Sequence, residues 1–182
     1  MTEQKSPTDI DYVVYKLDEF SGSCKEVDVL SQGFELVRWE PSLTRVIPWN
    51  TQFEKIGFLK NWVFHLPRLF LGRQLYCVYS LVSGNETLCQ CMLTPASCRY
   101  PFMGAEDMQF GLVFTPPMHR NKKLANIMVQ TIISKHQRCG VYWWLTEVHN
   151  TASRKLAERV GFKLVGKAIK KSAMGFSRYH LI

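Results

Sequence analysis

The sequence predicts an α/β (α+β) fold with a mixed sheet, on three observations. Apolar residues recur at helical spacing in residues 50–70 and again in 124–137. Around these helices lie runs rich in β-branched and aromatic residues, bounded by glycine, proline and asparagine. One run, 141–148, is almost fully apolar, as expected of a strand covered on both faces. Because no linker or repeat interrupts the alternation of helices and strands, we expect one domain over residues 1–182.

The elements follow in order from local signals. Residues 1–11 are polar and predict a flexible tail. Asn50 and Thr51 are suited to cap the first helix, and Pro67 to end or kink it. Ser83-Gly84-Asn85-Glu86 predicts a hairpin turn, and Gly161 the end of the last helix. The strands are expected at 12–17, 34–39, 75–82, 87–93, 107–115, 141–148, 162–169 and 176–182, and the helices within 50–70, at 124–137 and from Asn150 to about Val160.

Composition limits the classes of function. A chain of 182 residues, 46% of them hydrophobic, is long enough to bury a full core. It has no run of eighteen apolar residues, and residues 1–11 lack the apolar region of a signal peptide, so we expect a cytoplasmic protein outside the membrane. Residues 1–106 carry 10 Lys and Arg against 12 Asp and Glu, whereas residues 107–182 carry 13 against 3. Without an aromatic-rich basic stripe, this basic half favours a charged small ligand over nucleic acid or an anionic membrane surface.

The six cysteines show no metal-ligand spacing. Cys89 and Cys91 share one face of a predicted strand, but no further His or Cys cluster would complete a zinc site with them. Buried, reduced thiols are the better interpretation, and we expect no metal.

The segment after residue 107 is the most informative part of the chain. A strand breaks at Pro116-Pro117 and then enters a helix at Leu124 through a short basic turn. This turn carries Arg120, Lys122 and Lys123. A cation at a helix N-terminus is unfavourable by about 0.3–1 kcal/mol, so three cations there indicate a bound anion. The free amides of the helix start would add hydrogen-bond donors, and a polyphosphate group is the natural ligand.

A second signal follows about thirty residues later. Asn150 is a good helix N-cap, and Ser153 lies three residues on, beside the unpaired amides. The motif reads Asn150-Thr-Ala-Ser153-Arg-Lys-Leu156-Ala-Glu-Arg-Val160-Gly161-Phe162. With the basic turn before it, the region 107–166 resembles the acetyl-CoA-binding core of the GNAT superfamily of N-acetyltransferases. The turn matches the pyrophosphate signature of that family at Arg120 and Ala125, but Lys123 stands where the family usually has glycine.

The resemblance implies a GNAT fold, with a mixed central sheet of about six to seven strands flanked by helices and splayed between the fourth and fifth strands. It implies acetyl-CoA as cosubstrate, with its pyrophosphate on the basic turn. Its pantetheine would lie along the end of the strand 107–115, which is the fourth strand in the numbering of the family fold. The implied cofactor-binding residues are Phe114, Thr115, Arg120, Asn121, Lys122, Lys123, Leu124, Ala125, Asn150 and Ser153.

The catalytic groups depart from the usual family pattern. Many members of the family place a tyrosine acid four residues before the glycine of Gly-Phe, where this chain has Ala157. As general base, Glu147 ranks first, because it is nearly the only carboxylate of the basic half. It lies at the end of the strand 141–148, the fifth strand in the numbering of the family fold. Glu106 and Asp107 rank second and His149 third. Each has a structural alternative: Glu147 as the partner of a cation, and Glu106-Asp107 as turn residues.

The amine acceptor is expected to meet the N-terminal half of the chain. The loop 94–106, with Arg99, Tyr100 and Phe102, is a candidate wall or lid of that site. The expected function is transfer of an acetyl group from acetyl-CoA to a primary amine of a small molecule, with an amino sugar named first. The alternatives are a peptide or protein amine as acceptor, a non-catalytic acyl-CoA-binding module, and a nucleic-acid-binding domain. We expect no nucleic-acid or membrane partner, and a monomer or a homodimer.

Overall fold

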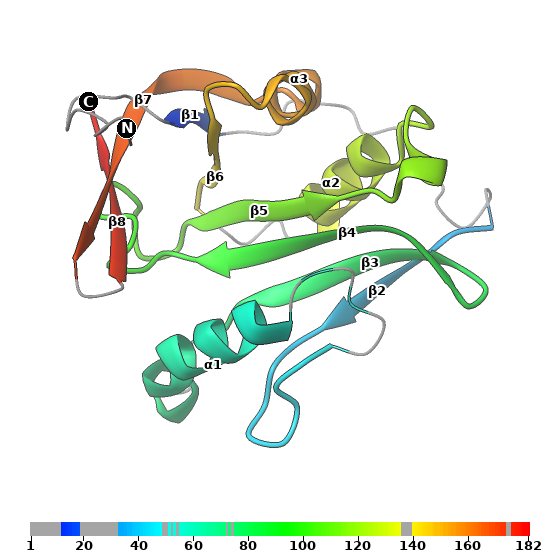
Figure 1. The fold of residues 1–182 in the computed structure, drawn as a ribbon, viewed down its shortest axis with the longest axis horizontal. Coiled ribbons are helices and arrows are strands. Elements are labelled where there is room, and N and C mark those ends of the chain that lie inside the picture. Colours follow the sequence, from blue (N-terminus) through cyan, green and yellow to red (C-terminus); the bar gives the residue numbers. More distant parts are fainter. Residues whose placement is uncertain are drawn as a thin grey trace, which may run out of the picture. The chain divides into compact units, whose positions relative to one another are not determined.

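The computed structural model describes residues 12–18, 33–48, 51, 53, 55–71, 73, 75–135, 140–173 and 176–182, so the predicted tail 1–11 lies outside it. These residues form a mixed α+β fold with eight strands (Figure 1), which confirms the fold class and exceeds the six to seven strands that the resemblance implies. No helix in the described part has the length and apolar character needed to cross a bilayer. The elements are β1 Tyr12–Leu17, β2 Glu35–Trp39, α1 Lys55–Phe70, β3 Cys77–Ser83, β4 Glu86–Pro95, β5 Met108–Phe114, the 3-10 helix η1 Pro117–His119, α2 Leu124–Lys135, β6 Tyr142–Glu147, α3 Thr151–Val160, β7 Lys163–Ala173 and β8 Phe176–Leu181.

The chain divides into two compact units. Unit 1 consists of residues 1–19, 96–109 and 139–182, and unit 2 of residues 20–95 and 110–138. Unit 1 therefore holds β1, β6, β7, β8 and α3, whereas unit 2 holds β2, β3, β4, most of β5, α1 and α2. The single domain over residues 1–182 stays a prediction.

In unit 2 the strands β2, β3 and β4 form an antiparallel meander. Ser83 pairs with Glu86, so Gly84 and Asn85 make the turn and the predicted hairpin is confirmed. One hydrophobic cluster of this unit contains Tyr76, Val78 and Met92, with Trp39 and Phe53 packed against it. Helix α2 packs on β4 through a buried stripe of Leu124, Met128, Val129, Ile132 and Ile133.

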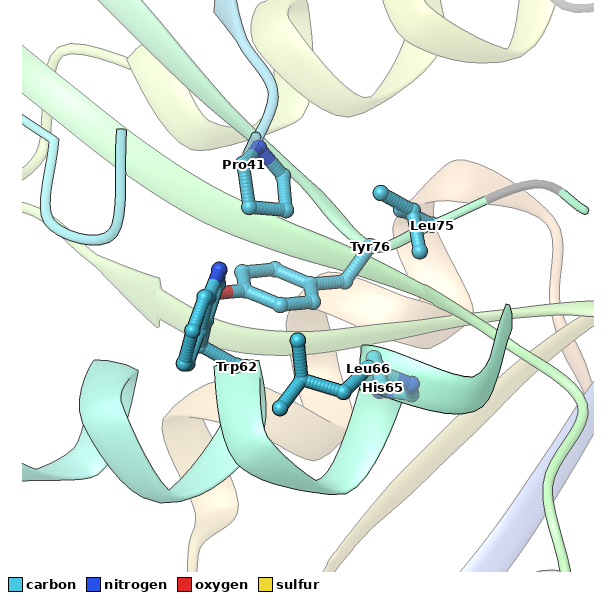
Figure 2. Close-up of a pocket in the computed structure, with 6 residues that line it drawn as sticks. All are labelled: Pro41, Trp62, His65, Leu66, Leu75 and Tyr76. Carbon is cyan, nitrogen blue, oxygen red and sulfur yellow. The ribbon is translucent and has the colours of Figure 1, made fainter. Parts of the chain in front are cut away.

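Helix α1 packs on the residues that lead into β3. Figure 2 shows Trp62, His65 and Leu66 of α1 pointing toward the ring of Tyr76. Together with Pro41 and Leu75 they line a cavity of about 10 Å³, roughly the room that one water molecule needs. The Tyr76 hydroxyl is buried there and has no hydrogen-bond partner among the described residues. Burial raises the pKa of Tyr76 to about 12, so the phenol stays neutral.

Two details of α1 differ from the sequence prediction. The described helix begins at Lys55, whereas the Thr51 hydroxyl accepts a hydrogen bond from the amide of Phe53 (3.1 Å) and orders the residues before the helix. Asn50, the other predicted cap, lies outside the described residues. Pro67 does not end the helix, which continues to Phe70. The carbonyl of Pro67 still accepts a hydrogen bond from the amide of Leu71 (3.2 Å), so the last turn remains closed.

In unit 1 four strands form an antiparallel sheet in the order β6-β1-β7-β8. Successive side chains of β1 and β6 alternate between its two faces. On one face Val14, Trp143 and Ala168 form a core cluster. Phe102 and Met103, in the loop before β5, pack against it. On the other face α3 packs on β6, and the indole of Trp144 contacts the ring of Phe162 at 5.6 Å.

The carboxylate of Asp107 joins the loop before β5 to the start of β6. It accepts hydrogen bonds from the amides of Gly104 (2.8 Å) and Val141 (3.0 Å) and from the indole Nε1 of Trp143 (2.7 Å). Asp107 is 8% exposed, so water offers little compensation if these bonds are lost. A Cβ added at Gly140 would lie 2.8 Å from the same carboxylate, which explains glycine at that position.

We predict that Asp107→Asn destabilises the protein by about 1–3 kcal/mol, because the amide nitrogen of asparagine replaces one acceptor oxygen and cannot accept from the N–H donors bonded to that oxygen. The measurement is the free energy of unfolding from urea titrations. Glu106→Gln is the matched control, since Glu106 is exposed, and it should change this free energy by less than about 0.5 kcal/mol. Equal effects of the two substitutions would contradict the role given to Asp107.

Candidate functional site

The basic turn lies in unit 2, between β5 and α2. After β5 ends at Phe114, the prolines begin η1, and residues 120–123 lead into α2 at Leu124. Among the described residues, the amides of residues 121–126 have no hydrogen-bond partner. Three of them belong to the first turn of α2, whose amides have no intrahelical acceptor. The predicted set of free donors is therefore present at this turn.

The turn is shaped by left-handed backbone at two positions. Asn121 has a φ of 63° and Lys123 a φ of 59°, whereas Lys122 between them does not have a positive φ. Alternation of left-handed and right-handed residues turns successive N–H groups toward one side and makes an anion-binding concavity. Asparagine adopts this conformation readily, but lysine does so at a cost of about 1–2 kcal/mol. Lys123 thus takes a conformation that favours glycine, the residue that the family usually has there.

Several contacts hold the turn in place. The Arg120 side chain folds back and donates from Nε to the carbonyl of Thr115 (3.1 Å), and Leu124 is buried at the start of α2. The Thr115 hydroxyl lies 3.2 Å from Sγ of Cys89 on β4. His119 lies 2.8 Å, from Nε2 to Oε1, from Glu86 in the hairpin. Lys122 and Lys123 are exposed, so their charges are available to a ligand.

An open depression of about 540 Å³ lies beside the turn in unit 2. Its wall is polar on the hairpin side, where Asn85, Glu86 and Thr87 contribute, and mixed on the side of η1. It is lined by Thr51, Asn85, Glu86, Thr87, Pro116, Met118 and His119.

Strand β5 is irregular where it approaches the turn. Leu112 has a φ of 48° in mid-strand, and its side chain is 56% exposed. Left-handed backbone is costly for leucine and interrupts regular strand geometry. Phe114, two residues on, is half-buried, and its ring packs edge-on against Phe53 at 6.5 Å. The two residues expected along pantetheine, Phe114 and Thr115, thus follow directly on this irregular segment.

The second motif lies in unit 1. Asn150 caps α3, its side-chain oxygen accepting from the amide of Ser153 (3.0 Å), as predicted. The Ser153 hydroxyl accepts a hydrogen bond from Nε1 of Trp144 (2.9 Å), which ties the first turn of the helix to β6. Gly161 ends the helix with a φ of 109°, and the amide of Phe162 donates to the carbonyl of Ala157 (3.0 Å). Both polar residues of the motif therefore have a structural role.

Ala157, at the position of the usual tyrosine, is fully buried. The tyrosine hydroxyl that reaches α3 belongs instead to Tyr15 of β1. Tyr15 donates from its hydroxyl to Oε1 of Glu158 (3.0 Å) and accepts from Nε of Arg154 (3.3 Å). Burial, opposed in part by Arg154, raises the pKa of Tyr15, so this phenol is a neutral link between sheet and helix.

The four candidate bases differ in exposure and in partners. Glu147 is exposed at the end of β6, and its backbone carbonyl accepts from the amide of Asn150 (3.1 Å). Glu106 and His149 are also exposed. Asp107, in contrast, is buried, and its carboxylate already accepts three hydrogen bonds. Glu147, Glu106 and His149 therefore remain accessible to a substrate, whereas Asp107 is committed to the loop.

Sequence reasoning missed the aromatic surroundings of Glu147. Antiparallel pairing places Tyr12 directly opposite Glu147, and the ring of Tyr179 lies 5.0 Å from that of Tyr12. The register of β1 against β6 and β7, and of β7 against β8, carries this proximity, and no local motif signals it. No three His, Cys, Asp or Glu side chains of the described residues gather as a metal site. Cys77, Cys89 and Cys91 are buried, free thiols, as interpreted from the sequence, whereas Cys98 is free but exposed, which corrects that interpretation at this position. Cys24 and Cys139 lie outside the described residues.

Comparison with protein families places these features in context. Residues 92–162, from β4 to the end of the Gly-Phe motif, match the acetyltransferase (GNAT) family. Over this segment the chain is similar to members of that family. The matched segment contains the basic turn, α2, β6 and the Asn150 motif, and it indicates an acyltransferase. No curated protein matches the sequence.

Solved structures of similar fold include acetyltransferases. Aminoglycoside N-acetyltransferase AAC(6′)-Iy in complex with CoA has a TM-score of 0.52 and 12% identity, over 76% of this chain and 98% of that one. The aminoglycoside 6′-N-acetyltransferase AAC(6′)-IG of Acinetobacter haemolyticus has a TM-score of 0.50 and 12% identity, over 68% and 83%. A protein of Novosphingobium aromaticivorans described as GNAT has a TM-score of 0.46 and 14% identity, and this chain spans 85% of its own length and 60% of that protein. At 12% identity the two aminoglycoside enzymes show a shared fold and nothing finer.

The positive φ of Lys123 in the basic turn predicts how substitutions there change stability. Lys123→Gly removes the side-chain clash of a positive φ and should raise the free energy of unfolding by about 0.5–1 kcal/mol. Lys122→Gly is the matched control: it removes the same charge at a position without positive φ, and should lower stability by about 0.5–1 kcal/mol. Urea midpoints of the two variants decide, and the same sign for both would contradict the geometry of the turn.

Proposed function

We propose that this protein is an N-acetyltransferase that moves an acetyl group from acetyl-CoA to a primary amine of a small molecule. The observation that carries the proposal is the turn at residues 120–126, where unpaired amides and cationic side chains converge on a helix N-terminus. Such a turn suits a pyrophosphate, which CoA supplies.

The charge of the chain supports a polyanionic cosubstrate. Residues 107–182 carry 13 Lys and Arg against 3 Asp and Glu. CoA brings a pyrophosphate and a 3′-phosphate, so it offsets several of these charges at once. A fold relative, AAC(6′)-Iy, was solved in complex with CoA. In this proposal Lys122 and Lys123 contact phosphate, while Arg120, bonded to Thr115, holds the turn and adds positive charge.

The reaction needs a neutral amine, and Glu147 is the group we assign to take its proton. The amine nitrogen then attacks the thioester carbonyl, forming the C–N bond, and the C–S bond breaks. CoA leaves as the thiolate, and the attacking nitrogen loses its second proton to water. The thiolate takes up a proton from water in turn, because Ala157 provides no hydroxyl. The products are the acetamide, the CoA thiol and one proton. Glu147 suits this role because its side chain is exposed, in contrast to that of Asp107.

For the acceptor we name an amino sugar first. Two fold relatives act on aminoglycosides according to their descriptions, and an amino sugar is the unit that such acceptors share. A peptide or protein amine is the second acceptor class. A non-catalytic acyl-CoA-binding module is the alternative that Ala157 motivates, since the residue removes the usual acid.

The cosubstrate assignment predicts specific binding of CoA. CoA at 100 times its dissociation constant should stabilise the protein against unfolding by about 2.7 kcal/mol. The double substitution Lys122→Ala/Lys123→Ala should weaken CoA binding about tenfold or more, because two charge-assisted contacts are lost. Lys163→Ala, an exposed lysine of β7, is the control and should leave the dissociation constant within about twofold. Urea unfolding with and without CoA measures the stabilisation, and titration calorimetry measures the dissociation constants. An unchanged affinity in the double variant would contradict the assignment.

Acetyl transfer is tested by release of free CoA thiol with a panel of glucosamine, kanamycin, tyramine and a short peptide with a free N-terminus. Glu147→Gln should lower kcat/KM by about 100-fold, the usual contribution of a general base. Glu35→Gln, an exposed carboxylate of β2, is the control and should keep full activity. CoA binding without turnover of any amine would favour the non-catalytic module, and a larger loss in Glu106→Gln than in Glu147→Gln would move the base to Glu106.

A further inference from the structure

A cluster of three tyrosines lies in unit 1. The rings of Tyr100 and Tyr179 stack at 5.4 Å with 21° between their planes, and Tyr12 meets Tyr179 edge-on at 5.0 Å. The hydroxyls of Tyr12 and Tyr179 are hydrogen-bonded to each other. The three residues come from the loop before β5, from β1 and from β8, so only the tertiary fold brings them together.

The cluster is held rigidly on the loop side. Tyr100 is 9% exposed, and its hydroxyl is hydrogen-bonded to the side chains of Gln109 and Arg99. The carbonyl of Arg99 accepts a hydrogen bond from the amide of Tyr179 (2.9 Å), which fixes the loop to β8. The Asp107 contacts fix the other end of the same loop to β6. The segment that the sequence suggests as a wall of the acceptor site is thus anchored at both ends.

Glu147 stands at the rim of this cluster. Tyr12 pairs with Glu147 on β6 and with Ala168 on β7, and Ala168 pairs with Leu181, two residues beyond Tyr179. Side chains paired across strands share one face, and so do residues two apart. Glu147, Tyr12 and Tyr179 therefore project from the same face of the sheet. Glu147 is exposed, while Tyr12 and Tyr179 are half-buried.

We propose that Glu147, Tyr12 and Tyr179 form the subsite that binds the ammonium group of the acceptor, with Tyr100 and Arg99 as positioning residues. This inference rests on the proposed acetyl transfer, and it names the chemistry that recognises the acceptor. A primary ammonium has three N–H donors. The carboxylate and the two phenolic oxygens offer three acceptors, and the carboxylate supplies the opposite charge. The aromatic rings around them add apolar surface and favour a cation near their faces.

The two phenols act as neutral acceptors and do not remove the proton. Burial raises the pKa of Tyr179 to about 12, and its hydrogen bond to Tyr12 and the nearby charge of Glu147 add to the rise. At neutral pH the phenol of Tyr179 is therefore neutral. Glu147 is therefore the group of this subsite that accepts the proton of the ammonium, and the tyrosines orient the nitrogen toward it.

The test compares Tyr12→Phe, Tyr179→Phe and the double variant with Tyr76→Phe. Tyr76 is the matched control, because it is a buried tyrosine of unit 2 whose hydroxyl has no partner among the described residues. Steady-state kinetics use the amine of the panel with the highest turnover. Each phenylalanine in the subsite should raise KM for the amine about tenfold, since a hydrogen bond to a charged group is lost, with a smaller change in kcat. The affinity for CoA and the KM in Tyr76→Phe should stay within about twofold of wild type.

A second readout separates this inference from the proposed function. Tyramine is titrated by calorimetry into wild type and Glu147→Gln without any CoA, with phenol as the neutral analogue. Weaker binding of tyramine in Glu147→Gln, with binding of phenol unchanged, supports the subsite even if no acetyl is transferred. Turnover of amines with KM unchanged in the tyrosine variants overturns the subsite but leaves the acetyltransferase intact. Equal binding of tyramine by wild type and Glu147→Gln also overturns it.

Discussion

The functional argument depends on one constraint: the backbone between Arg120 and Leu124 is left-handed at Asn121 and at Lys123. The amides of residues 121–126, around these two positions, have no partners inside the described chain. Unpaired amides and nearby cations are unfavourable by themselves, and a bound anion offsets both at once. The chain keeps lysine in a conformation that favours glycine, which adds a charge to the turn at a cost in backbone strain.

The carboxylates of unit 1 show how exposure separates structural from chemical roles. Asp107 accepts three hydrogen bonds from N–H groups and fastens a loop to the sheet. Glu147 is exposed at the end of β6, beside Tyr12 and Tyr179. The first carboxylate makes the surface rigid, and the second remains accessible to a substrate. Rigid support behind an exposed charged group is what a preorganised binding site requires.

The tyrosines of unit 1 are similarly divided. Tyr15 links β1 to α3 through Glu158 and Arg154, on the face of the sheet that carries the helix. Tyr12 and Tyr179 lie on the opposite face, together with Glu147. Burial raises the pKa of both Tyr15 and Tyr179, so each phenol serves as a neutral hydrogen-bonding group. On the α3 side of the sheet, position 157 holds a buried alanine. The described hydrogen bond between Trp144 and Ser153 on that side joins the helix to the sheet.

By itself the sequence determined the features that depend on neighbouring residues. The hairpin at Ser83–Glu86, the cap at Asn150, the helix end at Gly161 and the basic turn at Arg120 are local, and the structure agrees with each. Only the tertiary structure decided that the Asp107 carboxylate accepts hydrogen bonds from N–H groups of other segments. It also decided that Tyr12, Tyr100 and Tyr179 form a cluster beside Glu147. Proline at position 67 shows the same limit, since α1 continues beyond it to Phe70. Hydrogen bonds between distant segments and the register of paired strands set these outcomes, and neither leaves a periodic signal in one chain.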